Sequence, residues 1–127
     1  MNGTDPRPMK NRRFAERLGF AVAGLRIVFA RESSFRGQCA LALAAVSVTL
    51  APEPGPLWWA LIALSIALVL SFELANGALE YLLDHLHPDR AREIGAAKDA
   101  AAGAVLVAGL AAGSVGALML VATLGRG

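Results

Sequence analysis

Hydrophobic and polar positions divide the 127-residue chain into four segments of helical character. Residues 13–30 repeat apolar side chains every three or four positions and carry arginines between them, which predicts an amphipathic helix. Three apolar runs follow at 34–51, 57–83 and 98–124. Their lengths and composition predict helices that cross a membrane. The expected fold class is therefore an all-α integral membrane protein with one amphipathic helix and three transmembrane helices.

The amphipathic segment 13–30 has two interpretations. It can lie on the membrane surface with its apolar side in the headgroup region, or it can pack on a water-soluble core as an ordinary helix. The rest of the chain offers no soluble core for it to join. The surface location is favoured, and the preceding residues 1–12, which are polar and contain two prolines, are expected to form a disordered tail.

Breaker residues and charges separate the three apolar runs. The first run is short, and Arg36 near its start is expected to extend it by reaching up to the headgroups while its aliphatic stem stays in hydrocarbon. Residues 52–56 contain three prolines and one glycine and predict a turn, followed by Trp58 and Trp59 at a membrane interface. The second run is about 40 Å long, so its end should protrude from the membrane into a loop at 84–97.

Small residues dominate the third run. Gly109 and Gly113 stand four positions apart, a spacing that allows close approach between membrane helices. Packing between helices, including helices of different protomers, is the interpretation favoured over a phosphate-binding glycine loop, because no strand precedes these glycines.

Composition and charge restrict the possible functions. Hydrophobic residues make up 56% of a chain too small to bury them in a soluble core. Eight of the twelve Lys and Arg residues precede residue 37, so the N-terminus and the 84–97 loop should be cytoplasmic, and the 52–56 turn and the C-terminus should lie outside. Nucleic-acid binding is disfavoured because no aromatic residues are interleaved with the basic ones for base stacking. Cys39 is expected to be structural, and the pair His85 and His87 is a weak metal motif.

Polar residues follow one side of the second apolar run. Glu73 lies about 24 Å along the predicted helix from Leu57, near the inner edge of the hydrocarbon region. Glu80 is seven residues later on nearly the same side, Asn76 lies between them, and Asp84 extends the series by one turn. A carboxylate at this depth is costly, so this side should face protein or water and mark a functional site.

Other charged residues are expected at the same membrane level. Glu32 precedes the first run, and Lys98 and Asp99 begin the third. Carboxylates that can hold Mg²⁺, a lysine for phosphate oxygens and a carboxylate that can deprotonate a hydroxyl are the components of phosphoryl transfer. Three alternatives remain open. Glu73 and Glu80 could pair with Arg36 or Lys98 to lock helices together, the chain could be a proton-coupled transporter that uses Glu73, or it could be a non-enzymatic assembly factor.

Four sequence blocks carry a resemblance to a known family. They are GLR at 24–26, Glu32-Ser-Ser-Phe35-Arg36, ELANGALEYLLD at 73–84 and AAKDAAAGAVL at 96–106. In order and spacing the chain resembles the prokaryotic diacylglycerol kinase family over residues 13–124. The resemblance implies a homotrimer of three-span protomers in the bacterial inner membrane, with active sites shared between subunits, that phosphorylates a membrane lipid with ATP and Mg²⁺.

The resemblance also implies roles for individual residues. Glu73 matches the general base, Asn76 its polar neighbour, and Glu32 and Glu80 the metal-holding carboxylates. The nucleotide-binding residues implied are Arg13, Phe20, Glu32, Glu80, Asp89, Lys98 and Asp99. The acceptor-binding residues implied are Phe35, Arg36, Gln38, Glu73 and Ala102. Phe20 stands where many members have tyrosine.

The lipid acceptor is open between two members of the family. Diacylglycerol, which would give phosphatidic acid, is the favoured acceptor. The His-Pro pair at 87–88 and the AKDAAAGAV string also resemble undecaprenol kinases, which phosphorylate a long polyprenol.

Overall fold

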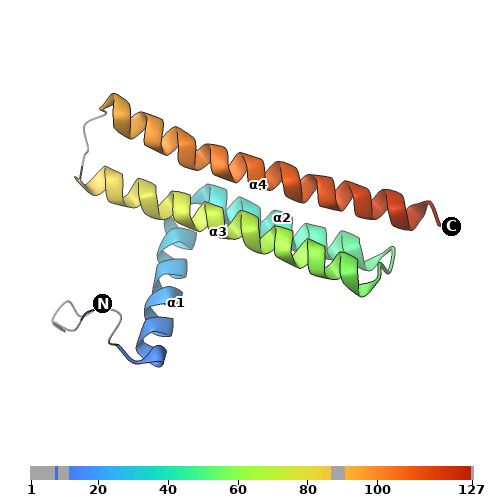
Figure 1. The fold of residues 1–127 in the computed structure, drawn as a ribbon. Coiled ribbons are helices and arrows are strands. Elements are labelled where there is room, and N and C mark those ends of the chain that lie inside the picture. Colours follow the sequence, from blue (N-terminus) through green and yellow to red (C-terminus); the bar gives the residue numbers. More distant parts are fainter. Residues whose placement is uncertain (1–7, 9–11, 87–90, 127) are drawn as a thin grey trace.

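The computed structural model describes residues 8, 12–86 and 91–126, and this part of the chain is helical throughout its regular structure. The helices are α1 (Phe14–Arg31), α2 (Ser33–Leu50), α3 (Pro56–Leu86) and α4 (Arg92–Leu124). Helices α2, α3 and α4 lie side by side in a bundle, and α1 leaves it at a steep angle (Figure 1). The all-α class predicted from the sequence is confirmed.

Helix α1 begins and ends at polar signals. The Glu16 side chain accepts a hydrogen bond from the Arg13 backbone N–H at 3.2 Å, which fixes the first turn. The last turn is closed by Arg36, whose guanidinium donates to the carbonyl oxygens of Phe29 at 2.6 Å and Ala30 at 3.0 Å. Most large apolar side chains of α1 are exposed in the chain as it stands, so this helix keeps an apolar surface that the bundle does not cover.

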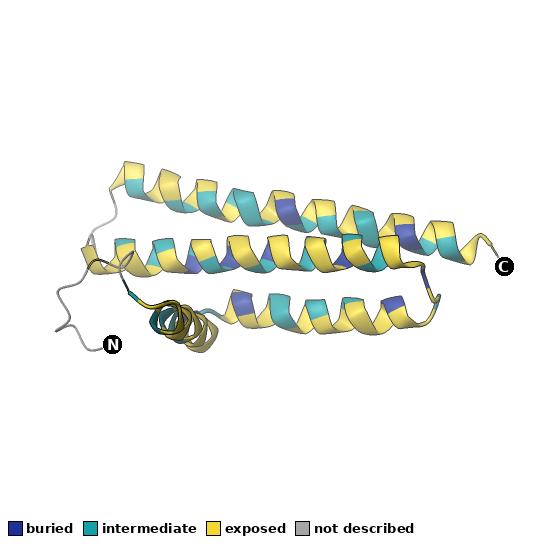
Figure 2. Cartoon of the chain, turned by 60° about the horizontal axis from the view of Figure 1, so that its bottom comes forward, coloured by how far each residue is buried: buried dark blue, intermediate teal, exposed yellow. Residues whose placement is uncertain are grey.

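The bundle has a thin core and a broad apolar exterior. The buried apolar residues of the described chain are Val28, Phe35, Ile62, Val69, Ala108 and Met119. Exposed residues cover the outward sides of all three bundle helices (Figure 2), and many of them are leucine, valine or phenylalanine. Helices α3 and α4 are long and apolar enough to cross a membrane.

Several hydroxyl groups on the bundle helices donate hydrogen bonds within their own helix. Five of them donate to the carbonyl oxygen four residues earlier, at 2.7–2.8 Å: Ser47, Thr49, Ser65, Ser114 and Thr123. These hydroxyl groups therefore need no water molecule as a partner, which suits helices surrounded by lipid.

The helix bounds correct two of the sequence predictions. Helix α3 continues to Leu86 and α4 begins at Arg92, so the expected connection at 84–97 is shorter than predicted. The segment from Arg92 to Ala97 is rich in good helix formers and has Glu93 in the first turn, where the helix dipole favours a negative charge. These gains outweigh the cost of about 1 kcal/mol for Gly95 in a helix.

Helix α2 is shorter and less apolar than the other two predicted spans. Its 18 residues correspond to about 27 Å, slightly less than a hydrocarbon core of about 30 Å, and they include Arg36 and Gln38. By length and hydropathy, α3 and α4 meet the requirements for a span among the described helices, and α2 does not. Cys39 on α2 is a half-buried free thiol. Most of the predicted tail 1–12 lies outside the described residues, as does His87.

Candidate active site

Glu73 is the buried carboxylate of the bundle. Its exposed fraction is 5%, and it lies on α3 with an apolar residue at most neighbouring positions. The hydroxyl of Ser34, at the start of α2, donates to Glu73 Oε2 at 3.2 Å. A buried carboxylate is costly without such donors, so a functional or structural reason must retain it.

The cations suggested as structural partners of Glu73 bond to other groups. Arg36 donates to the two α1 carbonyl oxygens described above. Lys98 Nζ lies 2.5 Å from Asp84 Oδ1 in a half-exposed ion pair between α4 and α3. The interpretation of Glu73 as a simple ion-pair lock with Arg36 or Lys98 therefore does not describe this arrangement.

A single extended residue, Glu32, joins α1 to α2. Its backbone angles, φ −104° and ψ 106°, place it outside both helices, while its N–H still donates to Val28 O at 2.8 Å. We call residues 31–35 the elbow. The elbow packs on α3 at Gly77, where an added Cβ would lie 3.1 Å from Val28 Cγ1 and 3.2 Å from Glu32 Cγ. Gly77 thus permits the close approach that brings the Glu32 side chain to α3.

Glu80 lies one turn beyond Gly77 on the same side of α3, a rise of about 4.5 Å. It is half-buried, as is Glu32. The described residues hold no group of three or more acidic, histidine or cysteine side chains that would form a complete metal cage. Two carboxylates fit Mg²⁺ in another way, because this ion commonly keeps several waters and binds one or two carboxylates together with substrate phosphates.

Asn76 carries an unsatisfied polar atom in the same region. Its Oδ1 is buried and has no hydrogen-bond partner within the described part of the chain. Asn76 follows Glu73 by three residues and therefore lies one turn away on a neighbouring side of α3. A buried amide oxygen without a donor normally needs a partner, which a bound ligand or a second subunit can supply.

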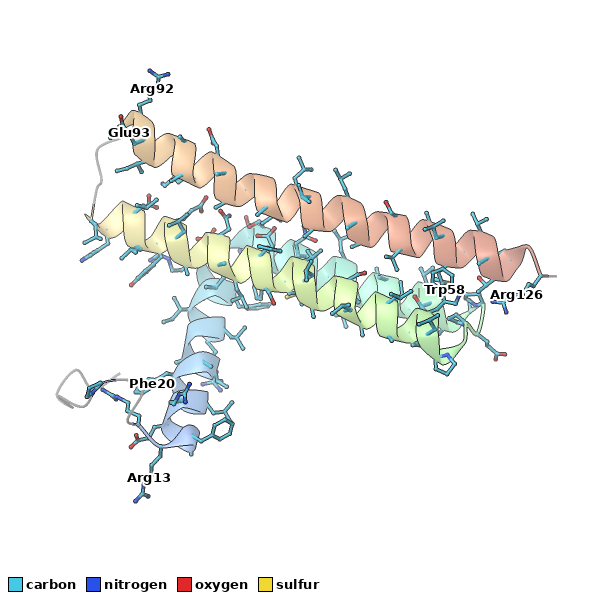
Figure 3. The ribbon with its side chains drawn as sticks, viewed as in Figure 1. Arg13, Phe20, Trp58, Arg92, Glu93 and Arg126 are labelled. Atoms are coloured by element: carbon cyan, nitrogen blue, oxygen red, sulfur yellow. The ribbon has the colours of Figure 1, made fainter. Side chains whose placement is uncertain are left out.

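The expected nucleotide-binding residues are distributed over both ends of the site region. Lys98 pairs with Asp84, and Asp99 beside it is exposed. Arg13 and Phe20 lie on the part of α1 farthest from the bundle (Figure 3). The guanidinium of Arg12 stacks 4.9 Å from the centre of the Phe20 ring, and Asp89 lies outside the described residues. Within one chain, the structure does not bring Arg13 or Phe20 to the carboxylates of α3.

The expected acceptor-binding residues also differ in position. Phe35 is buried in the elbow and packs edge-to-face on Phe29, with ring centres 6.4 Å apart. Gln38 lines an apolar groove of about 430 Å³ between α2, α3 and α4, whose other walls include Thr49, Val69 and Gly113. Ala102 is exposed on α4. Phe35 and Arg36 therefore have structural contacts that the sequence did not reveal.

Comparison with known proteins identifies the family. The family model for prokaryotic diacylglycerol kinase matches residues 19–120, which is most of the chain. The chain belongs to the prokaryotic diacylglycerol kinase family. The match includes the elbow, the carboxylates of α3 and the Lys98-Asp99 pair, and together with the apolar helices it marks the chain as a membrane protein.

Two relatives in the family carry the same name. The diacylglycerol kinase of Haemophilus influenzae is 30% identical over 89 residues, which are 70% of this chain and 75% of the relative. The diacylglycerol kinase of Synechocystis is 35% identical over 102 residues, which are 80% of this chain and 58% of the relative. The resemblance stated from the sequence blocks is confirmed by these matches.

Two residues of the site region were missed by the sequence analysis. Ser34 stands 39 positions before its partner Glu73, and Gly77 is one of thirteen glycines in the chain. Neither stands out in the sequence, because each is defined by a contact between helices distant along the chain. Their positions inside the matched blocks at 32–36 and 73–84 were the only available signal.

Proposed function

We propose that this protein transfers the γ-phosphate of ATP to the hydroxyl of diacylglycerol at the inner face of a bacterial membrane, giving phosphatidic acid. The observation that carries the proposal is the arrangement on α3. A buried carboxylate, Glu73, lies about 10 Å along the helix from Glu80, and Glu32 packs between them at Gly77. One helix thereby offers a carboxylate at lipid depth and another toward water.

Glu73 acts as the general base in this proposal. One of its carboxylate oxygens accepts the proton of the lipid hydroxyl while the hydroxyl oxygen of the lipid attacks the γ-phosphorus. The bond between the γ-phosphorus and the β,γ-bridging oxygen breaks, which releases ADP. Burial keeps water away from Glu73, which favours the lipid over hydrolysis. Asn76 lies one turn away, and its Oδ1, which has no partner within the described residues, is available to a donor from a second subunit, because Glu73 takes the single hydroxyl proton of diacylglycerol.

Glu32 and Glu80 would hold Mg²⁺ that arrives with ATP. Mg²⁺ supplies neutralisation of the phosphate charge that develops during transfer. The elbow sets the distance between these two carboxylates, because Glu32 contacts α3 at Gly77 and Glu80 follows by one turn. Together with the ATP phosphates and several waters, the two carboxylates would supply the octahedral coordination that Mg²⁺ requires.

Lys98 would bind the phosphate oxygens after its ion pair with Asp84 breaks. Their ion pair is half-exposed, and such pairs contribute only about 0–1 kcal/mol. Exchange of Asp84 for a phosphate is therefore inexpensive. Asp99, Arg13, Phe20 and Asp89 remain proposed nucleotide contacts, and the distance of Arg13 from the α3 carboxylates in one chain favours a site completed by another subunit.

Gly77→Ala is expected to impair MgATP binding through the elbow. The new methyl group would lie 3.1–3.2 Å from side-chain atoms of Val28 and Glu32, so these side chains must move by a few tenths of an ångström. We expect the KM for MgATP to rise about tenfold because the metal-holding carboxylates lose their spacing. Steady-state kinetics would measure this, with Gly37→Ala, where an added Cβ meets nothing within 4 Å, as the control. An unchanged KM for MgATP would show that the packing of the elbow on Gly77 does not contribute to nucleotide binding.

The acceptor is tested by direct competition. Vesicles that contain diacylglycerol and undecaprenol in equal amounts are supplied with labelled ATP, and the two phosphorylated lipids are separated and counted. Label mainly in phosphatidic acid supports diacylglycerol as the acceptor. Label mainly in undecaprenyl phosphate would assign the chain to the undecaprenol kinases, for which the groove beside Gln38 would be the polyprenol-contacting surface.

The proposal includes a homotrimer in which α2 is a third membrane span and α1 lies on the inner membrane surface. The exposed apolar side of α1 supports the surface location. Trp58 and Arg126 lie at one end of the bundle, and Arg92 and Glu93 lie at the other (Figure 3). The first end is proposed to face outward and the second, with the N-terminus, inward.

Gly113→Leu is expected to reduce trimer formation. Gly113 is exposed at the wall of the groove between α2, α3 and α4, where an added Cβ would meet no atom within 4 Å, and the open groove of about 430 Å³ leaves room for a side chain within the protomer. A contact between subunits through small residues would leave no such room. Chemical crosslinking in detergent should show a loss of most of the trimer. Gly95→Leu, equally unobstructed but near the other end of α4, is the control, and an intact Gly113→Leu trimer would place the subunit interface elsewhere.

A further inference from the structure

Ser34 differs from the other hydroxyl residues of the bundle in its bonding. Five serine and threonine hydroxyls donate to a carbonyl oxygen within their own helix. The Ser34 hydroxyl instead crosses from α2 to α3 and donates to Glu73 Oε2 at 3.2 Å. Its acceptor is 5% exposed, while Ser34 itself is exposed, so the bond is part-buried and joins the surface of α2 to a buried carboxylate.

We propose that Ser34 is a positioning residue for Glu73 in the phosphoryl transfer, an inference that rests on the proposed function. A carboxylate has two oxygens and about four lone-pair sites, and Ser34 occupies one of them. This bond restricts rotation of the carboxylate and leaves the remaining sites to accept the proton of the lipid hydroxyl. A hydrogen bond to a charged acceptor is among the stronger ones available to a side chain.

The elbow explains why Ser34 can perform this role. Glu32 and Ser34 are two residues apart, and they contact α3 at Gly77 and Glu73, which are four residues or about 6 Å apart. Arg36 holds the same turn by bonding two carbonyl oxygens at the end of α1. One short segment therefore fixes the position of Glu32, proposed to hold the metal, and the orientation of Glu73, the proposed base. The metal-binding group and the base thus keep a constant position relative to each other.

The test compares Ser34→Ala with Ser34→Thr in the full-length protein in bilayers. Alanine cannot donate, so we expect kcat for diacylglycerol phosphorylation to fall about tenfold, with both KM values unchanged. Threonine keeps the hydroxyl, and Ser34→Thr should recover most of the rate. Ser47→Ala is the matched control and should behave as the unchanged protein, because Ser47 lies on the same helix but its hydroxyl donates to the carbonyl oxygen of Leu43.

A double substitution separates positioning from general destabilisation. If Ser34 acts through Glu73, adding Ser34→Ala to Glu73→Gln should cause no further loss of rate. A further tenfold loss, a Ser34→Ala kcat within twofold of the unchanged protein, or a raised KM for the lipid with unchanged kcat would each overturn the inference. The proposed function fails differently: the unchanged protein would phosphorylate no lipid, or Glu73→Gln would stay fully active, and the inference would fall with it.

Discussion

Glu73→Gln should lower kcat for lipid phosphorylation by about a thousandfold, because glutamine cannot accept the hydroxyl proton that a positioned general base removes. The substitution keeps the shape of the side chain, and the amide oxygen can still accept the Ser34 hydrogen bond at 3.2 Å. The fold should therefore persist. MgATP binding, which we propose is carried by Glu32 and Glu80, should change little, so the loss should appear in kcat and not in the KM for MgATP.

Steady-state transfer of labelled phosphate in vesicles, together with a separate nucleotide-binding measurement, would check this prediction. Glu53→Gln is the matched control, because Glu53 lies in the turn between α2 and α3, outside the proposed site. Full activity of Glu73→Gln would remove Glu73 from the chemical step. Loss of nucleotide binding along with activity would instead indicate a structural role.

Glu80→Gln should lower kcat/KM for MgATP by about a hundredfold, since removal of one charged ligand weakens neutralisation of the transferring phosphate. The concentration of Mg²⁺ required for half-maximal activity should rise in parallel. Glu32→Gln should act in the same direction. Glu32 contacts α3 at Gly77, one turn from Glu80, and both are proposed to hold the same ion, so the double variant should lose less than the product of the single losses.

Mg²⁺ titrations of the single and double variants distinguish a ligand from a residue that only stabilises the elbow. Asp84→Asn is a useful comparison, because Asp84 lies one turn beyond Glu80 but bonds Lys98. A Glu80→Gln variant with an unchanged Mg²⁺ requirement would contradict the assignment of Glu80 to the metal. A variant with lowered activity and a lowered melting temperature alone would assign it to packing.

The pattern of apolar positions predicted most helix bounds well, because these helices are apolar along most of their length. The predicted segments 13–30, 34–51 and 57–83 agree with α1, α2 and α3 to within three residues at each end. The exception is α4, whose first turns at Arg92–Ala97 are polar and carry a glycine. Hydropathy marks where a helix enters apolar surroundings, and a helix that begins in water starts before that signal.

The candidate site could be predicted only in part, because its geometry depends on contacts between helices. Glu73 and Glu80 stand out in the sequence as carboxylates on an apolar helix. Ser34 and Gly77 do not, since a serine and a glycine have many ordinary uses. Arg36 was assigned to the lipid or the headgroups, and its guanidinium closes the last turn of α1.

Arg13 and Phe20, two of the proposed nucleotide-binding residues, do not reach the rest of the site within a single protomer. Both lie far along α1 from the α3 carboxylates (Figure 3). In the proposed trimer, the α1 helix of one protomer would reach a neighbour. The proposed sharing of the site between subunits agrees with the direction in which α1 leaves the bundle (Figure 1).

Transfer of the γ-phosphate of ATP to diacylglycerol by the purified protein in vesicles is the decisive measurement. Phosphatidic acid should accumulate with MgATP, and the Glu73→Gln protein prepared in the same way should form almost none. Formation of no phosphorylated lipid by the unchanged protein, with diacylglycerol and undecaprenol each supplied, would contradict the assignment of this site to lipid phosphorylation.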